Sequence, residues 1–444
     1  MLRRTARWIA DRELWPLAVG AALATFFPGY AAYGLLLILL LWLIRWAARG
    51  RPTIPCPYNL PALILLLMAG VSLVISVDPM TSFVWAARLI AGIALMLGIV
   101  NWARSEAHLA VLGIAMAVVG LGMALLTPLG IEWPRTLEAA AERLPASSTW
   151  LTALRGSFNP NMMAGALAVL IPFPLALLLF SPVRYPSTRG AVLHPIAWLL
   201  DRAWVRLPLC LLTLAAVPAA LFVTQSRGGW LGAGAALWVL LAGHWPGWGI
   251  LLPAAVGAGG YALWHSDLLT TPQRYLVTSS LSSLAGRGDI WLRALYVLRD
   301  FPLTGVGLGM FGKAVGWLYP KFNGFDVVHY PHAHNLFLQV GADLGVPGLL
   351  AYLWMLGAAF WAGAAAARGL GRQGKRGLQG LAWACLAGLA GMTLHGILDA
   401  TTWVVGKGGF VPFMVMGLAA ALSMTSHSIP QENVDNFLDN NVQV

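Results

Sequence analysis

The sequence predicts an all-α integral membrane protein with about twelve transmembrane helices. Hydrophobic residues make up 59% of its 444 positions, charged residues make up only 10%, and the mean hydropathy is +0.72. Apolar runs of about 18 or more residues recur along the whole chain, and each is long enough to cross a hydrocarbon core about 30 Å thick. This composition excludes a soluble globular class.

The apolar runs define the expected spans in order. The first twelve residues are basic and precede an apolar stretch, as in a secretory signal. Because another apolar run begins near Tyr33, we expect a membrane hairpin instead of a cleaved peptide. The twelve expected spans lie at approximately 15–31, 33–48, 60–78, 83–101, 108–129, 161–181, 207–224, 229–243, 247–264, 335–362, 378–398 and 405–424.

The distribution of Lys and Arg predicts the orientation of these spans. An even number of spans places both termini on one side of the membrane. With the termini in the cytoplasm, sixteen of the 28 basic residues fall in cytoplasmic segments and five in short external loops. Six more lie in one long external loop, which the positive-inside rule exempts because of its length. We therefore expect cytoplasmic termini.

Four regions follow from this arrangement. Residues 1–264 form an N-terminal transmembrane bundle with spans one to nine, and residues 265–334 form the long external loop region. Residues 335–424 contain spans ten to twelve, and the polar, acidic residues 425–444 are expected to be a disordered tail.

The long external loop contains one predicted amphipathic helix and one glycine-rich turn. The helix is expected from Gly286 to Phe301, with Asp289 near its start, where a carboxylate suits the helix dipole. Its apolar residues recur at helical spacing at Ile290, Trp291, Ala294, Leu295 and Leu298. The turn that follows has no Walker lysine and no preceding strand, so a nucleotide-phosphate loop is not expected.

Charge and cysteine content exclude further classes. The net charge is +11, but the basic residues are scattered between apolar runs and form no continuous phosphate-binding surface, so no nucleic-acid partner is expected. Cys56, Cys210 and Cys385 have no metal-ligand spacing and none lies in an expected external loop, so we expect neither disulfides nor thiolate catalysis. No cofactor is expected.

Four arginines are expected at or near the external face. Arg155 precedes the sixth span, Arg227 lies in the turn between spans seven and eight, Arg287 opens the amphipathic helix, and Arg88 lies within span four. Each arginine also has an explanation that needs no site. The Arg88 side chain can extend to the membrane surface, Arg227 can be an ordinary cation of a turn, and Arg155 and Arg287 can be solvated in loops. If the helices bring them together, guanidinium groups suit a pyrophosphate because they stay protonated and bind phosphate oxygens in pairs.

His334 is the candidate general base, because it lies at the first turn of span ten beside these arginines. A neutral imidazole there can accept a proton from a sugar hydroxyl, although a histidine that only anchors the helix fits too. His332 and His329 are expected to be supporting or solvated. Alternate residues on an irregular segment lack zinc-ligand spacing, so no metal site is expected. His395 and Asp399, four residues apart, are expected to form a structural hydrogen-bonded pair, with a proton relay as the alternative.

Five motifs occur in a fixed order around the long loop. They are Arg155-Gly-Ser-Phe-Asn-Pro-Asn, Ser226-Arg227-Gly228, Gly286-Arg287 with Trp291, Pro302-Leu-Thr-Gly-Val-Gly, and His334-Asn335. This ordered set, over about residues 150–350, resembles the O-antigen ligase and O-antigen polymerase superfamily of bacterial membrane glycosyltransferases. The resemblance implies a GT-C type, metal-independent, inverting enzyme of the bacterial inner membrane with a periplasmic active site.

The resemblance also implies residue roles. The family's base corresponds to His334, and its pyrophosphate-contacting arginines correspond to Arg227 and Arg287, with Arg155 as a third. Arg88 has no motif match and depends on the physical argument alone. Residues expected to support the site are Asn335, His332, Asn159, Asn161 and Asp289.

The implied partners are a glycan on undecaprenyl pyrophosphate as donor, lipid A–core as acceptor, and membrane lipid. We favour an O-antigen ligase, an enzyme of lipopolysaccharide biosynthesis, over a chain polymerase or an O-linked protein glycosyltransferase. The protein-modifying branch is not favoured, because its members often carry a longer C-terminal region than the one expected here. A transporter or flippase is the alternative of another class, but transporters generally place polar residues at the midplane and show paired repeats.

Overall fold

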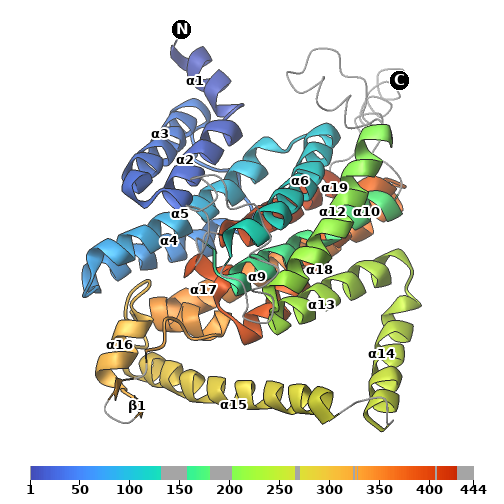
Figure 1. Cartoon of the computed structure of the whole chain (residues 1–444). Coiled ribbons are helices and arrows are strands. Elements are labelled where there is room, and N and C mark those ends of the chain that lie inside the picture. The colour runs from blue at the N-terminus through green and yellow to red at the C-terminus, as the bar shows by residue number, and fades with distance from the viewer. Residues whose placement is uncertain are drawn as a thin grey trace, which may run out of the picture.

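The computed structural model describes residues 2–131, 158–180, 203–265, 271–323, 326–327, 329–405 and 408–427. Helices make up nearly all of this structure (Figure 1). Eight helical segments in the described ranges are long and apolar enough to cross a membrane, and shorter apolar helices accompany them. The prediction of an all-α integral membrane protein is confirmed, and each expected span contains a helix. Residues 425–427 of the expected tail belong to the last described helix, which ends at His427, and the rest of the tail lies outside the described residues.

The N-terminal part begins with the expected hairpin. Its elements are α1 (Leu2–Ala10), α2 (Leu14–Phe26), the 3-10 turn η1 (Pro28–Tyr30), α3 (Ala31–Arg49), α4 (Asn59–Ile75), α5 (Pro79–Trp102) and α6 (Glu106–Gly130). Helices α2 and α3 pack closely where Gly34 faces Gly20. A Cβ atom on Gly34 would lie 2.5 Å from the Gly20 carbonyl oxygen, so only glycine permits this approach.

The middle part contains a broken sixth span. It is formed by α9 (Pro160–Leu170) and α10 (Pro172–Leu179), and then follow α12 (Ala203–Thr224), α13 (Arg227–His244) and α14 (Trp248–His265). The break falls at Ile171, directly before Pro172, because proline has no N–H to continue the helical hydrogen bonds. The tight turn expected between spans seven and eight lies between α12 and α13.

The C-terminal part forms the centre of the bundle. It comprises α17 (Leu336–Arg372), α18 (Arg376–Leu398), the π-helical turn η3 (Thr401–Val405) and α19 (Phe410–His427). Helix α17 packs against both α18 and α19, α13 packs along α18, and α5 packs along α19. One large apolar core extends through these helices.

The region between α14 and α17 differs from its prediction. Its elements are α15 (Thr271–Asp300), α16 (Phe311–Leu318) and the antiparallel strands β1 (Phe322–Asn323) and β2 (Asp326–Val327). The expected helix start at Gly286 is wrong, because the helix begins at Thr271 with Pro272 in its first turn, where proline is tolerated. Asp289 therefore lies inside the helix, and the helix-dipole argument for it does not apply.

The glycine-rich turn after α15 docks into a kink of α17. The kink lies at Gly345, with φ 68° and ψ −174°, two residues before Pro347. The carbonyl groups of Ala342 and Asp343 accept hydrogen bonds from the main-chain nitrogens of Val306 and Gly307 at 2.9 and 3.1 Å. The kink thus leaves helical carbonyl groups for the turn to bind, and the turn holds the first part of α17 in place.

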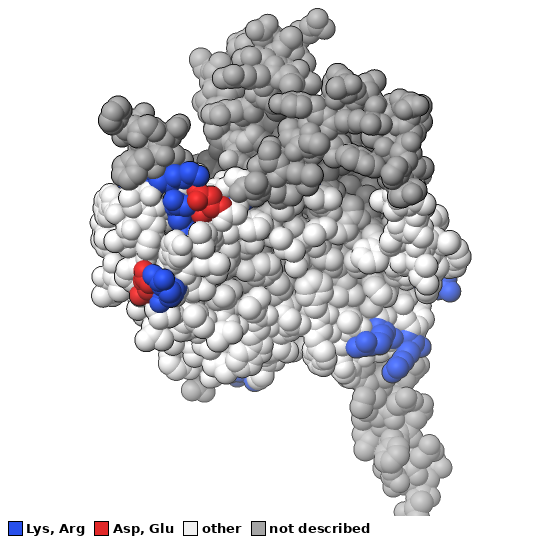
Figure 2. Space-filling model, turned by 90° about the horizontal axis from the view of Figure 1, so that it is seen from below, with Lys and Arg blue, Asp and Glu red and all other residues white. Residues whose placement is uncertain are grey.

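The surface is largely apolar. Large apolar side chains are exposed along the membrane helices, as expected for faces that contact hydrocarbon tails. Figure 2 shows one face, on which charged side chains form a few small groups on an otherwise uncharged surface. The acidic side chains visible on this face lie next to basic ones.

Candidate active site

His334 lies in the turn that leads into α17, which begins at Leu336, one residue after the expected start of span ten. Asn335 caps the helix, because its Oδ1 accepts hydrogen bonds from the nitrogens of Phe337 and Leu338, both at 3.0 Å. The Nδ2 of Asn335 donates to the carbonyl of Ile397 at 3.1 Å. One side chain therefore both starts α17 and joins it to the last turn of α18.

The backbone of His334 is held in an uncommon conformation. Its φ is +48°, in the left-handed region that few non-glycine residues occupy. The indole nitrogen of Trp291 donates to the His334 carbonyl at 3.3 Å, and the nitrogen of Ala333 donates to Oε1 of Gln339 at 2.7 Å. Such a conformation costs about 1–3 kcal/mol and persists when its surroundings enforce it. The direction of the imidazole is thus set before any substrate binds.

Asp399 is the partner of His334. The His334 Nδ1 lies 3.4 Å from Oδ2 of Asp399, and the nitrogen of Thr401 donates to Oδ1 at 3.0 Å. Burial alone would raise the pKa of Asp399, but the hydrogen bond from His334 and the nearby imidazoles lower it below its usual range. An ionised Asp399 accepts a hydrogen bond from Nδ1–H of His334, and this leaves Nε2 as the basic nitrogen of a half-buried ring that is 24% exposed.

The expected pairing of His395 with Asp399 is wrong. Helix α18 ends at Leu398, and Asp399 has extended backbone angles, φ −153° and ψ 152°. Its carboxylate therefore turns away from the helix and meets His334. The ring of His395 is fully buried, and neither ring nitrogen makes a hydrogen bond within the described residues. Glycine at position 165 makes room for it, because a Cβ atom there would lie 2.8 Å from the His395 Cε1.

His332 is buried directly beside His334. The two ring centroids are 4.1 Å apart, and His332 Nδ1 accepts a hydrogen bond from the His334 nitrogen at 3.3 Å. Burial lowers the pKa of His332 to about 4, and the charges of His334 and Arg287 add to this effect while Asp399 opposes it. His332 is neutral at pH 7 and supports the turn as an acceptor.

The same residues form the group that could hold a cation. Ligand atoms of His332, His334 and Asp399 lie within 4.8 Å of one another, although the residue spacing had not predicted a metal site. Two imidazoles and a carboxylate are a donor set that zinc accepts, with water as a fourth ligand. His329, the third histidine of this segment, is exposed. Metal independence therefore stays a prediction that needs a direct test.

Arg227 begins α13 beside the end of α18. Ser226 caps α13 by accepting a hydrogen bond from the nitrogen of Gly229 at 3.2 Å. A Cβ atom on Gly228 would lie 3.7 Å from Cβ of Leu398, the residue that precedes Asp399. The exposed side chain of Arg227 thus begins next to the segment that carries Asp399.

Arg287 approaches the site from α15. It is half-buried and lies one helical turn before Trp291, whose indole donates to His334. The charge of Arg287 acts through space on both His332 and His395. The start of α13 at Arg227 and the charge of Arg287, which are far apart in the sequence, are therefore both brought to the region around the end of α18 and the His332–His334 turn.

Other predicted site residues lie elsewhere. Nη1 of Arg88 donates to the carbonyl of Val404 at 3.4 Å, so Arg88 holds the η3 segment that follows Asp399. Asn159 caps α9, because its Oδ1 accepts from the nitrogens of Asn161 and Met162 at 2.9 and 3.3 Å. The main chain of Asn161 lies near the buried ring of His395.

Arg155 lies outside the described residues. Asp289 binds Arg293, Lys321 and Tyr330 at 2.5, 2.8 and 3.0 Å. The hydrogen bond from Lys321 is the main reason that the pKa of Asp289 is lowered. Asp289 thereby ties α15 to the segment that leads into the His332–His334 turn.

A buried polar network supports the site and was missed in the sequence. Nε2 of Gln339 donates to Oδ1 of Asp343 at 2.9 Å, and the indole nitrogen of Trp403 donates to Oδ2 at 3.1 Å. Because Gln339 also accepts from Ala333, the network connects the His334 turn to η3. Gln339 and Asp343 are four residues apart in an apolar helix, and this spacing of polar residues was the signal that could have found them.

Comparison with known proteins supports the resemblance. A comparison with curated proteins found no match. Residues 208–353 match a family model described as O-antigen ligase. This range contains Arg227, Arg287 and the His332–Asn335 turn, whereas Asp399 lies beyond it. The resemblance drawn from the motifs is therefore confirmed over residues 208–353, where this membrane protein is similar to the O-antigen ligase family.

Proposed function

We propose that the protein transfers a glycan from undecaprenyl pyrophosphate to a hydroxyl group of lipid A–core at the periplasmic face of the inner membrane. One observation carries this proposal. The imidazole of His334 is paired with a buried carboxylate, Asp399, the helix that begins with Arg227 starts beside the segment that carries Asp399, and the charge of Arg287 acts on the neighbouring His332. A base beside cationic donors suits a reaction in which a hydroxyl loses a proton while a pyrophosphate leaves.

The chemistry is a single displacement. The acceptor hydroxyl gives its proton to Nε2 of His334 as its oxygen bonds to the anomeric carbon. The bond from that carbon to the pyrophosphate oxygen breaks, the electron pair leaves with undecaprenyl pyrophosphate, and the anomeric configuration inverts. Asp399 stabilises the imidazolium that forms, as a carboxylate does in hydrolase triads.

The arginines act on the leaving group. Arg227 and Arg287 neutralise the charge that develops on the pyrophosphate, and their planar groups bind its oxygens in pairs. The pyrophosphate-activated donor makes a nucleotide unnecessary. The undecaprenyl chain is apolar and would lie against the exposed apolar faces of the membrane helices.

The test uses the full chain purified in detergent, mixed with lipid-linked glycan and lipid A–core. We expect ligated product, and we expect His334→Ala to lower its rate by about 10²- to 10⁴-fold. His329→Ala is the matched control, because His329 is an exposed histidine of the same segment. Near-normal transfer by the His334 variant would overturn the assignment of the base.

Three further arms separate the alternatives. Lipid-linked glycan without lipid A–core gives longer lipid-linked chains if the protein is a polymerase. Protein acceptors are modified if it belongs to the protein-modifying branch. The assay is repeated with a chelator, and a rate that falls and returns with zinc would replace the metal-independent mechanism by one that uses His332, His334 and Asp399 as ligands.

A further inference from the structure

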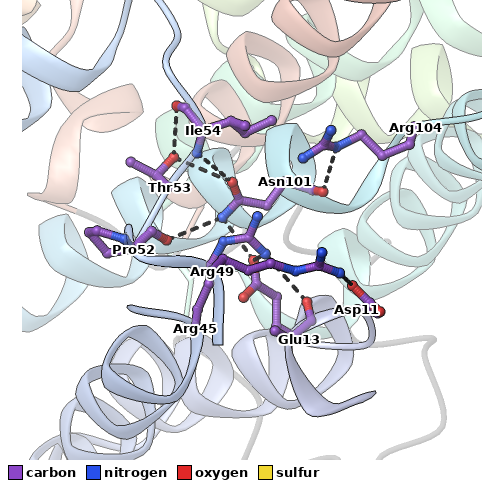
Figure 3. Close-up of polar contacts among 10 residues, drawn as sticks. Asp11, Glu13, Arg45, Arg49, Pro52, Thr53, Ile54, Asn101 and Arg104 are labelled. Carbon is purple, nitrogen blue, oxygen red and sulfur yellow. Dashed lines mark hydrogen bonds and ion pairs between the residues drawn. The ribbon is translucent and has the colours of Figure 1, made fainter. Parts of the chain in front are cut away.

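A cavity lined by arginines lies far from His334. Its volume is about 450 Å³, and its lining includes Arg45 and Arg49 of α3, Arg51, Arg104 between α5 and α6, Asp11 and Asn101. Figure 3 shows that the side chains of Arg45, Arg49 and Arg104 gather around Asn101.

This cavity lies at the opposite membrane face from the candidate active site. Helix α5 has 24 residues and is about 36 Å long at 1.5 Å per residue. At its first end, Asp78 binds Lys313 of α16, in the region that contains His334, at 2.6 Å. At its other end, Asn101 lines the cavity. The Lys and Arg distribution predicts that this second face is cytoplasmic.

The floor of the cavity is a built polar site. The buried side chains of Arg45 and Glu13 form an ion pair at 3.0 Å, and they are 6% and 1% exposed. Asn101 donates to the same carboxylate oxygen at 2.8 Å and accepts from the nitrogen of Ile54 at 3.0 Å. The Nε of Arg45 is buried without a hydrogen-bond partner in the described structure, and so is the Oε2 of Glu13. An unused buried donor is costly, so the guanidinium side of the floor favours a further acceptor.

The rim of the cavity carries guanidinium groups that are not paired with carboxylates in the described structure. Nε of Arg104 donates to the carbonyl of Asn101 at 2.9 Å, but its two terminal nitrogens make no hydrogen bond with any described residue. The guanidinium of Arg51 is exposed and makes no hydrogen bond or ion pair within the described ranges. Partial desolvation at the exposed rim, and then the charges of Arg45, Arg49 and Arg51, lower the pKa of Arg104. An anion between these groups would relieve their repulsion.

The charge balance indicates what the anion is. Among the described residues, four guanidinium groups line the cavity, whereas the carboxylates that face them are Asp11, paired with Arg49, and Glu13, paired with Arg45. The excess is two positive charges. Guanidinium groups prefer phosphate oxygens, which accept paired hydrogen bonds.

The neighbouring tryptophans indicate the membrane depth. Trp46 follows Arg45 in α3 and is 58% exposed, and Trp8 of α1 is 59% exposed. Exposed tryptophans are enriched at the level of lipid headgroups. We propose that this cavity binds the phosphate group of an anionic membrane phospholipid at the cytoplasmic face. Arginines that only set the orientation of a chain in the membrane, as in the positive-inside rule, need no cavity. Here a buried ion pair and Asn101 form one.

The experiment measures lipid binding by the full chain. The protein is reconstituted with phosphatidylglycerol and phosphatidylcholine in equal amounts, and native mass spectrometry gives the ratio of the two lipids that it retains. We expect retention of phosphatidylglycerol to be favoured. Arg51→Gln and Arg104→Gln should each weaken this preference by about tenfold, because each removes a charged donor. Both residues are exposed, so neither change should prevent folding.

Controls separate this cavity from general surface charge and from free phosphate. Arg376→Gln removes an exposed charge at the start of α18 outside the cavity, and it should leave the preference unchanged. Equal preference in the wild type, Arg51→Gln and Arg104→Gln proteins would overturn the proposal. If millimolar inorganic phosphate displaces phosphatidylglycerol, the ligand of the cavity is free phosphate and the lipid proposal is overturned. If phosphatidylglycerol stays bound, the lipid is supported as the ligand.

Discussion

The Nδ1 of His334 and the Oδ2 of Asp399 are 3.4 Å apart although the two residues are separated by 65 positions in the chain. His334 precedes α17 and Asp399 follows α18, so the pair joins the ends of two antiparallel neighbours. The amide of Asn335 strengthens this junction by its bond to Ile397. The proposed base is therefore oriented by a segment that lies outside residues 208–353.

Asp399→Asn tests whether this carboxylate supports the base. An amide cannot carry the charge that stabilises an imidazolium, so we expect kcat to fall by about 10²- to 10⁴-fold with little change in folding. The measurement is kcat for glycan transfer together with the thermal unfolding midpoint. Glu106→Gln is the matched control, because Glu106 pairs with Lys375 away from the site. A kcat for Asp399→Asn close to that of the wild type would exclude the proposed dyad.

Arg227→Lys and Arg287→Lys test the role of the guanidinium shape. Lysine keeps the charge but loses the paired hydrogen bonds, so kcat/KM for the lipid-linked donor should fall by about tenfold or more for each variant. Arg299→Lys is the control on α15, because Arg299 is 70% exposed and pairs with Asp300. Unchanged kcat/KM in both site variants would mean that these arginines do not bind the leaving group.

Gln339→Met tests the buried network behind the His334 turn. The change leaves the nitrogen of Ala333 and Oδ1 of Asp343 without their partner, and each loss inside the protein costs about 1–3 kcal/mol. We expect a lower unfolding midpoint and a lower kcat, because the turn loses a support. Gln379→Met is the control, because the side chain of Gln379 in α18 makes no hydrogen bond with any described residue, and it should change neither quantity. A Gln339 variant that also changes neither quantity would show that the network does not support the turn.

The pKa of His332 predicts how stability depends on pH. Burial lowers this pKa from 6.5 to about 4, so the unfolded chain binds the proton more readily than the folded chain between these values. The stability present above pH 6.5 should therefore decrease as the pH falls toward 4, by about 3 kcal/mol in total. His332→Gln should flatten this part of the stability profile, measured by unfolding at pH 7, 6 and 5. His329→Gln should leave the profile unchanged, and equal profiles for all three proteins would refute the assignment.

The spans and the turn that carries Arg227 were predictable because they depend on properties read along the chain. Membrane crossing requires about 20 apolar residues, and such runs predict helices almost wherever they occur. The expected start of span ten lies within one residue of the start of α17. The ordered motifs likewise predicted the resemblance that the family model finds at residues 208–353.

Features that depend on where a helix ends were not predictable. The spacing of His395 and Asp399 suggested a pair on one helix face, but one residue of extended backbone after Leu398 directs Asp399 to His334 instead. In the same way, a helix start at Thr271 moved Asp289 from a helix end to its interior, where it binds Lys321 and Tyr330.

The sequence by itself therefore determined the membrane class, the succession of helices and the residues able to do chemistry. Only the tertiary structure decided which of those residues meet, and it placed Asp399 beside His334 and Arg45 beside Glu13. The physical reason is that hydrophobicity is summed over a whole segment, whereas a hydrogen bond depends on ångström-scale positions set by helix ends and packing.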